Sequence, residues 1–171
     1  MGLRVKTKLA LIIISILILT AVDLKTKNLA ELKLKAQPGI TVIDGFWEFE
    51  YVENRNIAFS LGSQIPSNLK QYIIIGIGIA ALGFLGWFAY KSPKTKLTLV
   101  SIVLISAGAF GNLIDRIRNG YVVDFIHWYY KGFDWPVFNV ADIYVTIGMI
   151  FLIIEFLFSP HYRENSTVKK S

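Results

Sequence analysis

Four aspartates lie inside or at the ends of long apolar stretches, and they are the strongest candidates for chemistry in this sequence: Asp23, Asp115, Asp124 and Asp142. A charged side chain in hydrocarbon costs at least roughly 2.5–3.5 kcal/mol, so such residues usually mark a functional site. Two carboxyl groups held close together share one proton, because both cannot ionise easily. The ionised group can then take a proton from water while the protonated one polarises a carbonyl, which is the acid–base chemistry of peptide hydrolysis.

The composition excludes several other chemistries. The 171 residues include no cysteine, so disulfides, thiolate metal sites and a thiol nucleophile are ruled out. The sequence also lacks a His-Glu-x-x-His motif, a glycine-rich phosphate loop and an evident serine–lysine pair. His127 has no catalytic partner close in sequence, and the only other histidine is His161 in the C-terminal tail. We therefore interpret His127 as an interfacial residue without a catalytic role.

The elements that carry the aspartates are predicted to span a membrane. Hydrophobic residues make up 54% of the sequence and the mean hydropathy is +0.51, which is too apolar for a soluble domain of this length. About 20 apolar residues, each rising 1.5 Å, cross a hydrocarbon core. Four spans are predicted, in a single domain covering residues 1–171: residues 9–26, 69–90, 97–116 and 138–158. No small-x-small cleavage site follows the first span, so we do not interpret it as a signal peptide.

The distribution of basic residues predicts the orientation. Lys and Arg flank the spans at both ends of the chain and between the second and third spans: Arg4, Lys6, Lys8, Lys91, Lys94, Lys96, Arg163, Lys169 and Lys170. The positive-inside rule places these segments, and so both termini, in the cytoplasm. A net charge of +6 arranged in this way fits a membrane surface and gives no reason to expect a nucleic-acid partner. All four aspartates then fall at one depth, near the outer leaflet.

The outer segments have a structure of their own. Ile40–Ile43 and Phe46–Val52 flank an Asp-Gly dipeptide, the signal for a β-hairpin. In the second strand the aromatic residues alternate with Glu48 and Glu50, so one face is expected to rest on lipid headgroups and the other to be wet. Residues 54–60 are predicted to form a short interfacial helix, and Tyr121–Tyr130 to be extended.

Together these elements predict an all-α integral membrane protein, with four transmembrane helices, a small extracytoplasmic β-hairpin and a short interfacial helix. Spacing on the helices brings polar groups together. Asn112 and Asp115 share a helix face, and Gly108 on that face leaves room for another helix or a substrate chain. Asn139 and Asp142 repeat the Asn-x-x-Asp spacing at the start of the last span.

Three simpler interpretations of these residues remain open. Asn139 and Asp142 could serve as a helix cap alone. Arg116 could form an ion pair with the neighbouring Asp115 or anchor a lipid headgroup. Asp23 and Lys27 could be an ordinary i, i+4 ion pair on one helix.

Three sequence blocks resemble the signature of a known family, bacterial lipoprotein signal peptidase, also called signal peptidase II. They are Gly111-Asn112-Leu113-Ile114-Asp115-Arg116, Val122-Val123-Asp124-Phe125 and Phe138-Asn139-Val140-Ala141-Asp142. Two weaker blocks agree: Asp23 with Lys27, and the segment from Glu53 to Phe59, in which Asn56 stands where the family usually has glycine. The resemblance runs from about residue 9 to residue 158.

The resemblance implies an aspartyl endopeptidase of the bacterial inner membrane, inhibited by globomycin, that removes the signal peptide of a prolipoprotein just before a diacylglyceryl-modified cysteine. Its matching catalytic residues are Asp124 and Asp142. The residues that match positions lining or supporting the site are Asn54, Asn112, Asp115, Arg116, Asn139 and Asp23. No metal or organic cofactor is implied, and the partners are lipidated prolipoproteins and membrane lipid. One four-span unit holds every site residue, so we expect a monomer.

Two rival functions follow from the same residues. Carboxylates within a membrane also mark proton relays, which suggests a small proton-coupled transporter. Against this, the acids gather at one edge of the membrane, whereas a relay needs them at its middle or on both sides. A purely structural membrane protein would leave the two Asn-x-x-Asp pairs without a purpose.

Overall fold

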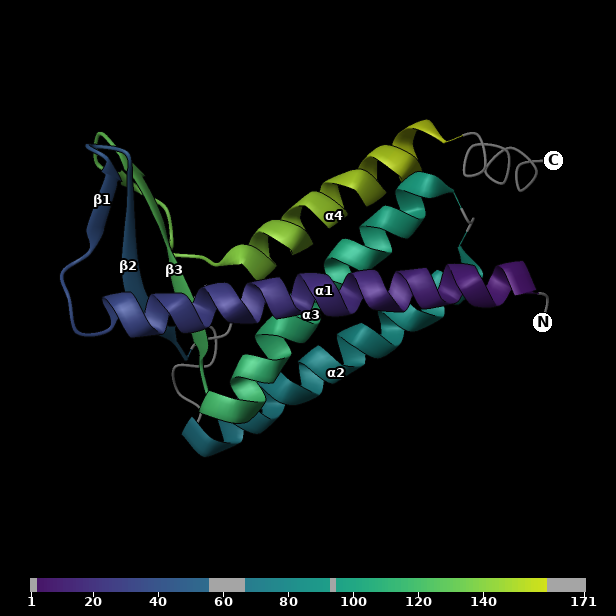
Figure 1. Ribbon diagram of the computed structural model, residues 1–171, viewed down its shortest axis with the longest axis horizontal. Helices are drawn as coiled ribbons and strands as arrows, with labels where there is room; N and C mark the ends of the chain where they lie inside the picture. Colours follow the sequence, from purple (N-terminus) through teal and green to yellow (C-terminus); the bar gives the residue numbers. More distant parts are fainter. Residues whose placement is uncertain (1–2, 56–66, 93–94, 160–171) are drawn as a thin grey trace.

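Four long helices and a small antiparallel sheet make up the computed structural model, which describes residues 3–55, 67–92 and 95–159 (Figure 1). The helices are α1 (Leu3–Leu34), α2 (Ser67–Lys91), α3 (Lys96–Asn119) and α4 (Val140–Phe158). Each is long and apolar enough to cross a membrane. The helices α1 and α3 run toward the sheet, and α2 and α4 run away from it (Figure 1).

The first helix is much longer than its apolar run predicts. It continues beyond the charged residues as far as Leu34, so Asp23 lies inside α1 and not at a helix end. The last turns of α1 carry Ala30 and Leu34, which are buried in a hydrophobic cluster with strand residues. Packing against the sheet therefore stabilises the helical conformation of the polar half of α1, since apolar contacts stabilise helices in proteins more than intrinsic propensity does.

The third helix lies at the centre of the bundle and contacts the other three. Its N-cap is Thr95, whose hydroxyl accepts a hydrogen bond from the Thr98 N–H at 3.1 Å, and its C-cap is Gly120, whose φ of 79° is left-handed. Gly108 lies against the main chain of α4, where a Cβ atom would collide with the carbonyl oxygen of Ala141. The space that this glycine leaves is therefore filled by a helix and not by a substrate chain.

The sheet contains four strands in the order β1-β2-β3-β4, each antiparallel to its neighbour. They are β1 (Ile40–Ile43), β2 (Trp47–Asn54), β3 (Val122–Tyr130) and β4 (Phe133–Asp134). The predicted hairpin is present as β1 and β2, and the predicted extended segment is β3. Their pairing into one sheet was not predicted, because the sequence does not indicate which strands are neighbours.

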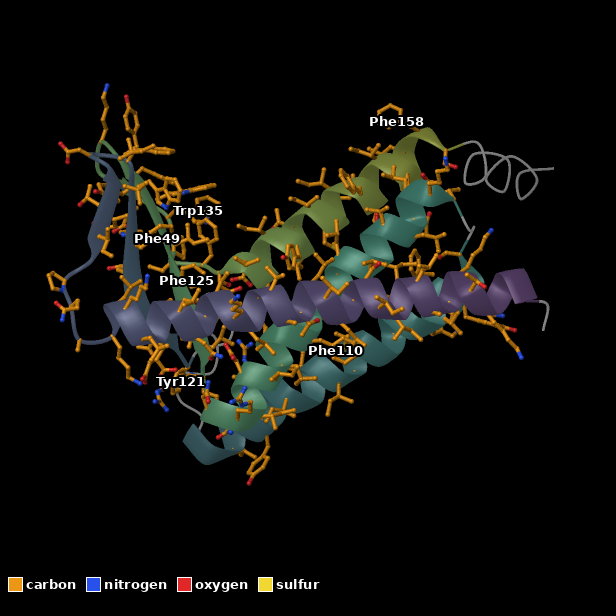
Figure 2. All side chains as sticks on the ribbon, viewed as in Figure 1. Phe49, Phe110, Tyr121, Phe125, Trp135 and Phe158 are labelled. Carbon is orange, nitrogen blue, oxygen red and sulfur yellow. The ribbon has the colours of Figure 1, made fainter. Side chains whose placement is uncertain are left out.

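Two expectations for the outer segments differ from the structure. Trp47 and Phe49 pack against the cluster that contains Val123 and Phe125. They were expected to rest on lipid headgroups instead. Phe49 and Phe125 lie at the sheet end of the molecule, far from Phe158 (Figure 2). Asn54 is the last residue of β2 and not the start of a helix. The rest of that predicted interfacial helix, residues 56–60, lies outside the described residues.

Candidate active site

Asp124 is a buried carboxylate on β3, held by two amide side chains. Its side chain is 2% exposed. Asn54, at the end of the paired strand β2, donates from Nδ2 to Oδ2 of Asp124 at 2.9 Å. Asn139, just before α4, donates from Nδ2 to Oδ1 at 2.6 Å. Each oxygen of Asp124 is therefore fixed by a group from a different part of the chain.

Asp142 is oriented by the first turn of α4. Asn139 and Asp142 form a capping box, in which the Asn139 side chain accepts from the Asp142 N–H and the Asp142 carboxylate accepts from the Asn139 N–H, both at 3.1 Å. The capping interpretation is thus confirmed, but it is incomplete. The other oxygen of Asp142 accepts a hydrogen bond from Nδ2 of Asn112 on α3 at 2.9 Å.

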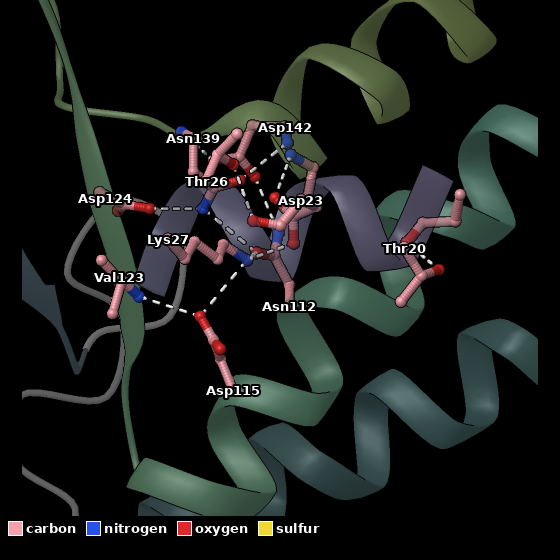
Figure 3. A network of polar contacts seen from close by, with 12 residues as sticks. Thr20, Asp23, Thr26, Lys27, Asn112, Asp115, Val123, Asp124, Asn139 and Asp142 are labelled. Carbon is pink, nitrogen blue, oxygen red and sulfur yellow. Dashed lines mark hydrogen bonds and ion pairs between the residues drawn. The ribbon is translucent and has the colours of Figure 1, made fainter. Parts of the chain in front are cut away.

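Two asparagines connect the two aspartates (Figure 3). Asn139 donates to Asp124 and also lies 3.2 Å from the Asn112 carbonyl oxygen, while Asn112 donates to Asp142. An asparagine side chain offers two donors and one acceptor on a rigid amide, so it can bridge two carboxylates without adding charge. Three elements, α3, β3 and α4, thereby bring Asp124 and Asp142 into one hydrogen-bonded network.

Lys27 is the cation at the base of this network. It is 1% exposed, and its Nζ atom lies 2.8 Å from Asp23, 3.3 Å from Asp115 and 2.8 Å from the Asn112 carbonyl oxygen. The predicted i, i+4 pair of Asp23 and Lys27 is real, but it belongs to a larger group. Because the lysine donates to the Asn112 oxygen, the Asn112 amide nitrogen is turned toward Asp142.

The two supporting aspartates also bind main-chain groups. Asp23 accepts a hydrogen bond from the N–H of Ala141 at 2.8 Å, at the start of α4. Asp115 accepts one from the N–H of Val123 at 3.1 Å, directly before Asp124 on β3. Each supporting carboxylate therefore fixes the backbone beside one member of the central pair: Asp23 beside Asp142, and Asp115 beside Asp124.

Arg116 lies outside this network. Among the described residues Asp115 pairs with Lys27 and not with the neighbouring arginine, so the ion pair of Asp115 and Arg116 that was left open is absent there. The arginine instead lines, with Asn112, one side of a mostly apolar groove between α2 and α3, opposite Ile74 and Ile77. Its main-chain oxygen accepts a hydrogen bond from Gln71 on α2 at 3.2 Å.

Burial sets the electrostatics of Asp124. It is the largest influence on Asp124 and raises the pKa of its carboxyl group, an effect to which the nearby charge of Asp142 adds. The hydrogen bonds from Asn54 and Asn139 oppose the rise. The pKa of Asp124 reaches about 6, well above the ordinary value of 3.8. Asp124 can therefore hold a proton under conditions in which an exposed aspartate is fully ionised.

The sequence predicted nearly all of these residues, but not how Lys27 connects them. Its contacts with Asn112 and Asp115 depend on the packing of α1 against α3, for which no local pattern exists. The available signal was the rarity of a lysine in a helix that also carries an intramembrane aspartate. No metal was expected at the aspartates. Among residues 3–55, 67–92 and 95–159, the one group of side chains close enough to share a metal ion lies elsewhere, on the sheet.

Known proteins share this sequence and this fold. Residues 15–158 match the family described as signal peptidase (SPase) II. A lipoprotein signal peptidase of Clostridium tetani is 37% identical over 154 residues, covering 89% of this chain and 96% of the relative. Another from Halothermothrix orenii is 38% identical over 144 residues, covering 84% and 93%.

A solved bacterial membrane enzyme structure has a similar fold. It superposes with a TM-score of 0.76 at 32% identity and covers 88% of this chain and 94% of its own. The segment that matches the family, residues 15–158, begins within α1, ends at the last residue of α4 and includes every residue of the network described above. The chain belongs to the signal peptidase II family.

Proposed function

We propose that this protein is an aspartyl endopeptidase that cleaves the signal peptide from a prolipoprotein, immediately before a diacylglyceryl-modified cysteine, with Asp124 and Asp142 as its catalytic residues. Membership of the signal peptidase II family supports the removal of signal peptides from prolipoproteins and disfavours the proton-transporter alternative. The observation that carries the aspartyl mechanism is the connection of Asp124 to Asp142 through Asn139 and Asn112.

The two carboxyl groups have different roles in this mechanism. Asp124, with its raised pKa, keeps the shared proton and donates it to the scissile carbonyl oxygen. Asp142 is the base: it takes a proton from a water molecule as the water oxygen attacks the carbonyl carbon. As the tetrahedral intermediate collapses, one of its hydroxyl groups returns a proton to Asp124 and becomes the new carbonyl, the C–N bond breaks, and the leaving amine receives the proton from Asp142. Both aspartates thus return to their starting states.

The asparagines prepare the pair for this reaction. Their amide donors stabilise negative charge on Asp124 once its proton has left, and they keep Asp142 aligned before substrate arrives. Groups that are already oriented need not reorganise during the reaction, which lowers its barrier. Asn54, Asn112 and Asn139 are positioning residues in this account. Lys27, Asp23 and Asp115 hold the elements on which the pair is carried.

The surroundings suit a lipidated substrate. The groove between α2 and α3 is mostly apolar and reaches Asn112, which bonds directly to Asp142. Acyl chains of the modified cysteine can stay among apolar side chains while the peptide bond reaches the aspartates. Each CH₂ group held in this way contributes roughly 0.8 kcal/mol to anchoring. In this proposal Arg116, on the same groove, contacts the polar part of the substrate.

The protein is a multi-pass protein of the bacterial inner membrane, as its four apolar helices and its family indicate. The proposal places both termini in the cytoplasm and the aspartates near the outer leaflet, on the strength of the lysine and arginine distribution. It also assigns activity to the monomer, because one chain supplies the complete network. Globomycin is expected to inhibit by occupying the space between Asp124 and Asp142.

A matched pair of substrates tests the proposal. Two prolipoprotein peptides differ only in that one carries diacylglyceryl-cysteine and the other a bare cysteine, and both are given to the purified protein in lipid vesicles. We expect cleavage before the lipidated cysteine, blocked by globomycin, and little cleavage of the bare peptide. Equal cleavage of both peptides would show a general membrane peptidase. A proton flux without cleavage would favour the alternative that the protein is a proton-coupled transporter.

A further inference from the structure

A second group of ionisable side chains lies on the sheet, apart from the aspartate pair. Glu48 and Glu50 alternate along β2, and His127 pairs directly with Glu48 across β3. Nδ1 of His127 lies 3.0 Å from the Glu48 carboxylate and 3.3 Å from that of Glu50. The three ligand atoms all lie within 4.8 Å of one another. On the other side of the ring, Nε2 contacts the carboxylate of Asp134 on β4.

A bound cation would fit this geometry as well as hydrogen bonding does. A single ring nitrogen carries at most one proton, yet Nδ1 of His127 faces two carboxylates. The separations of 3.0 and 3.3 Å resemble those between ligands that surround one ion. A tetrahedral zinc ion with bonds of 2.0–2.2 Å holds its ligand atoms about 3.4 Å apart.

The charges of the group are unbalanced. Glu48, Glu50 and Asp134 carry three negative charges, and His127 can offset one of them only when it is protonated. Among residues 3–55, 67–92 and 95–159, neither a lysine nor an arginine forms an ion pair with any of the three carboxylates. The acids are accessible, with exposed fractions of 26%, 35% and 74% for Glu48, Glu50 and Asp134. A cation from solution can therefore reach the group and would be attracted to it.

We propose that Glu48, Glu50 and His127 bind a divalent transition-metal ion, with zinc as the best fit, on the face of the sheet opposite to Asp124. An imidazole with two carboxylates is a donor set that suits zinc, whereas calcium and magnesium prefer oxygen ligands alone. Asp134 does not bind the ion. It accepts the N–H of the His127 ring and so directs Nδ1 toward the metal, an arrangement common at histidine ligands.

The ion would have a structural role. It joins β2 to β3, and through Asp134 it also holds β4, which is only two residues long. Its site is separate from the catalytic pair: residues 124 and 127 are an odd number of positions apart on β3, and successive side chains of a strand point to opposite faces. Bound metal is therefore expected to stabilise the sheet without supplying a catalytic group.

Calorimetric titration of zinc chloride into the full-length, untagged protein in detergent tests the proposal. His161→Asn is included throughout, so that His127 is the only histidine. We expect one zinc ion per chain, a higher melting temperature with zinc, and no competition from magnesium or calcium. Cobalt in place of zinc should give the visible absorption of a low-coordinate site. Failure of the otherwise native chain to bind one zinc ion overturns the proposal without requiring any ligand variant.

Variants then locate the site. Glu48→Gln with Glu50→Gln should abolish stoichiometric binding, and Asp134→Asn should weaken it by roughly 10- to 100-fold, the usual effect of losing a group that orients a ligand. Glu31→Gln removes a carboxylate that pairs with Lys35 and is the matched control, expected to bind as the parent does. Equal affinity in all variants, or equal binding of calcium, would place the ion elsewhere and contradict the assignment.

Discussion

Asn112 donates a hydrogen bond to Asp142 at 2.9 Å, and it can do so because its carbonyl oxygen is occupied by Lys27 at 2.8 Å. An amide presents its nitrogen to one side and its oxygen to the other, so the cation on one side determines which end faces the carboxylate. A lysine on α1 thereby orients a group on α3 that binds an aspartate on α4. The aspartate pair depends on a residue that contacts neither of its carboxylates.

Replacing either member of the pair should abolish cleavage. In Asp124→Asn and in Asp142→Asn, an amide cannot transfer the proton that each role requires. The double variant should be no worse than either single one, because the two carboxyl groups act as a unit. Cleavage of the lipidated peptide is the measurement, and Asp44→Asn, on the hairpin turn, is the control. Activity above a few per cent of the parent's in either single variant would contradict the assignment of the pair and make Asp115 the next candidate.

The raised pKa of Asp124 predicts a pH dependence of stability. Below the unfolded value of 3.8 the group is protonated in both states, and its favourable contribution is fully present. As the pH rises toward the folded value of about 6 the unfolded chain loses its proton first, so this contribution is progressively lost. A shift of this size corresponds to about 3 kcal/mol.

Asp124→Asn does not titrate and should escape this loss. Between pH 4 and pH 7.5 the stability of the variant should rise relative to that of the parent by up to about 3 kcal/mol. Thermal melting in detergent at the two pH values measures the change. A difference between the two proteins that stays constant with pH would show that Asp124 has an ordinary pKa.

Loss of the buried lysine should damage both stability and activity. Lys27→Met keeps the length of the side chain but leaves Asp23 and Asp115 without their cation. Breaking a buried pair in this way costs roughly 3–5 kcal/mol. It also frees the Asn112 amide to rotate. Lys25→Met changes an exposed lysine on the same helix and is the control.

Adding Asp23→Asn to Lys27→Met should restore part of the stability, since one uncompensated charge is then removed, but it should not restore cleavage. Melting temperature and peptide cleavage, measured on the same samples, separate the two effects. A Lys27→Met protein that cleaves normally would contradict the role given to Asn112.

Glycines on the helices should differ sharply in their tolerance of alanine. At Gly111 a Cβ atom would overlap the carboxylate of Asp23, so Gly111→Ala is expected to displace that side chain from the Ala141 N–H and to lower activity. At Gly86 no atom of the described structure lies within 4 Å of the added carbon, and Gly86→Ala should raise helix stability by up to about 1 kcal/mol. Equal effects at both positions would contradict the close packing of α1 and α3.

The proposed orientation can be tested with single cysteines, since the chain has none of its own. Asp44→Cys, on the hairpin, should react with a membrane-impermeant thiol reagent in intact cells, and Ser92→Cys, after α2, should react only in opened cells. The reverse pattern would place the aspartates on the cytoplasmic side and invert the topology.

Much of this arrangement could be predicted from the sequence because it depends on patterns among residues that are close together in the chain. Apolar runs mark the four helices, Asp-Gly marks the hairpin, and Asn139 followed by Asp142 marks a helix start. The aspartates could be predicted to lie together because the spans alternate in direction. This brings the C-terminal ends of α1 and α3 to the same side as the N-terminal end of α4.

What could not be predicted depends on contacts between distant segments. The apolar run of the first span stops at Val22, and only packing against the sheet explains a helix that reaches Leu34. Strand pairing placed the aromatic residues Trp47 and Phe49 inward, although alternation alone allows either face to be the buried one. The position of His127 between two glutamates has the same origin, since only the register of β2 with β3 brings them together.

In the proposed function, the length of α1 bears on where the substrate is cut. Its 32 residues, rising 1.5 Å each, extend about 48 Å, whereas the hydrocarbon core is about 30 Å thick. One unbroken helix therefore carries exposed apolar residues, the Asp23–Lys27 pair and the residues that hold the sheet. In the proposed orientation the bilayer fixes the apolar half of α1, and the rigid helix keeps the distance from there to Asp124 and Asp142 constant. In the proposed function, the peptide bond is therefore selected by its height above the membrane core.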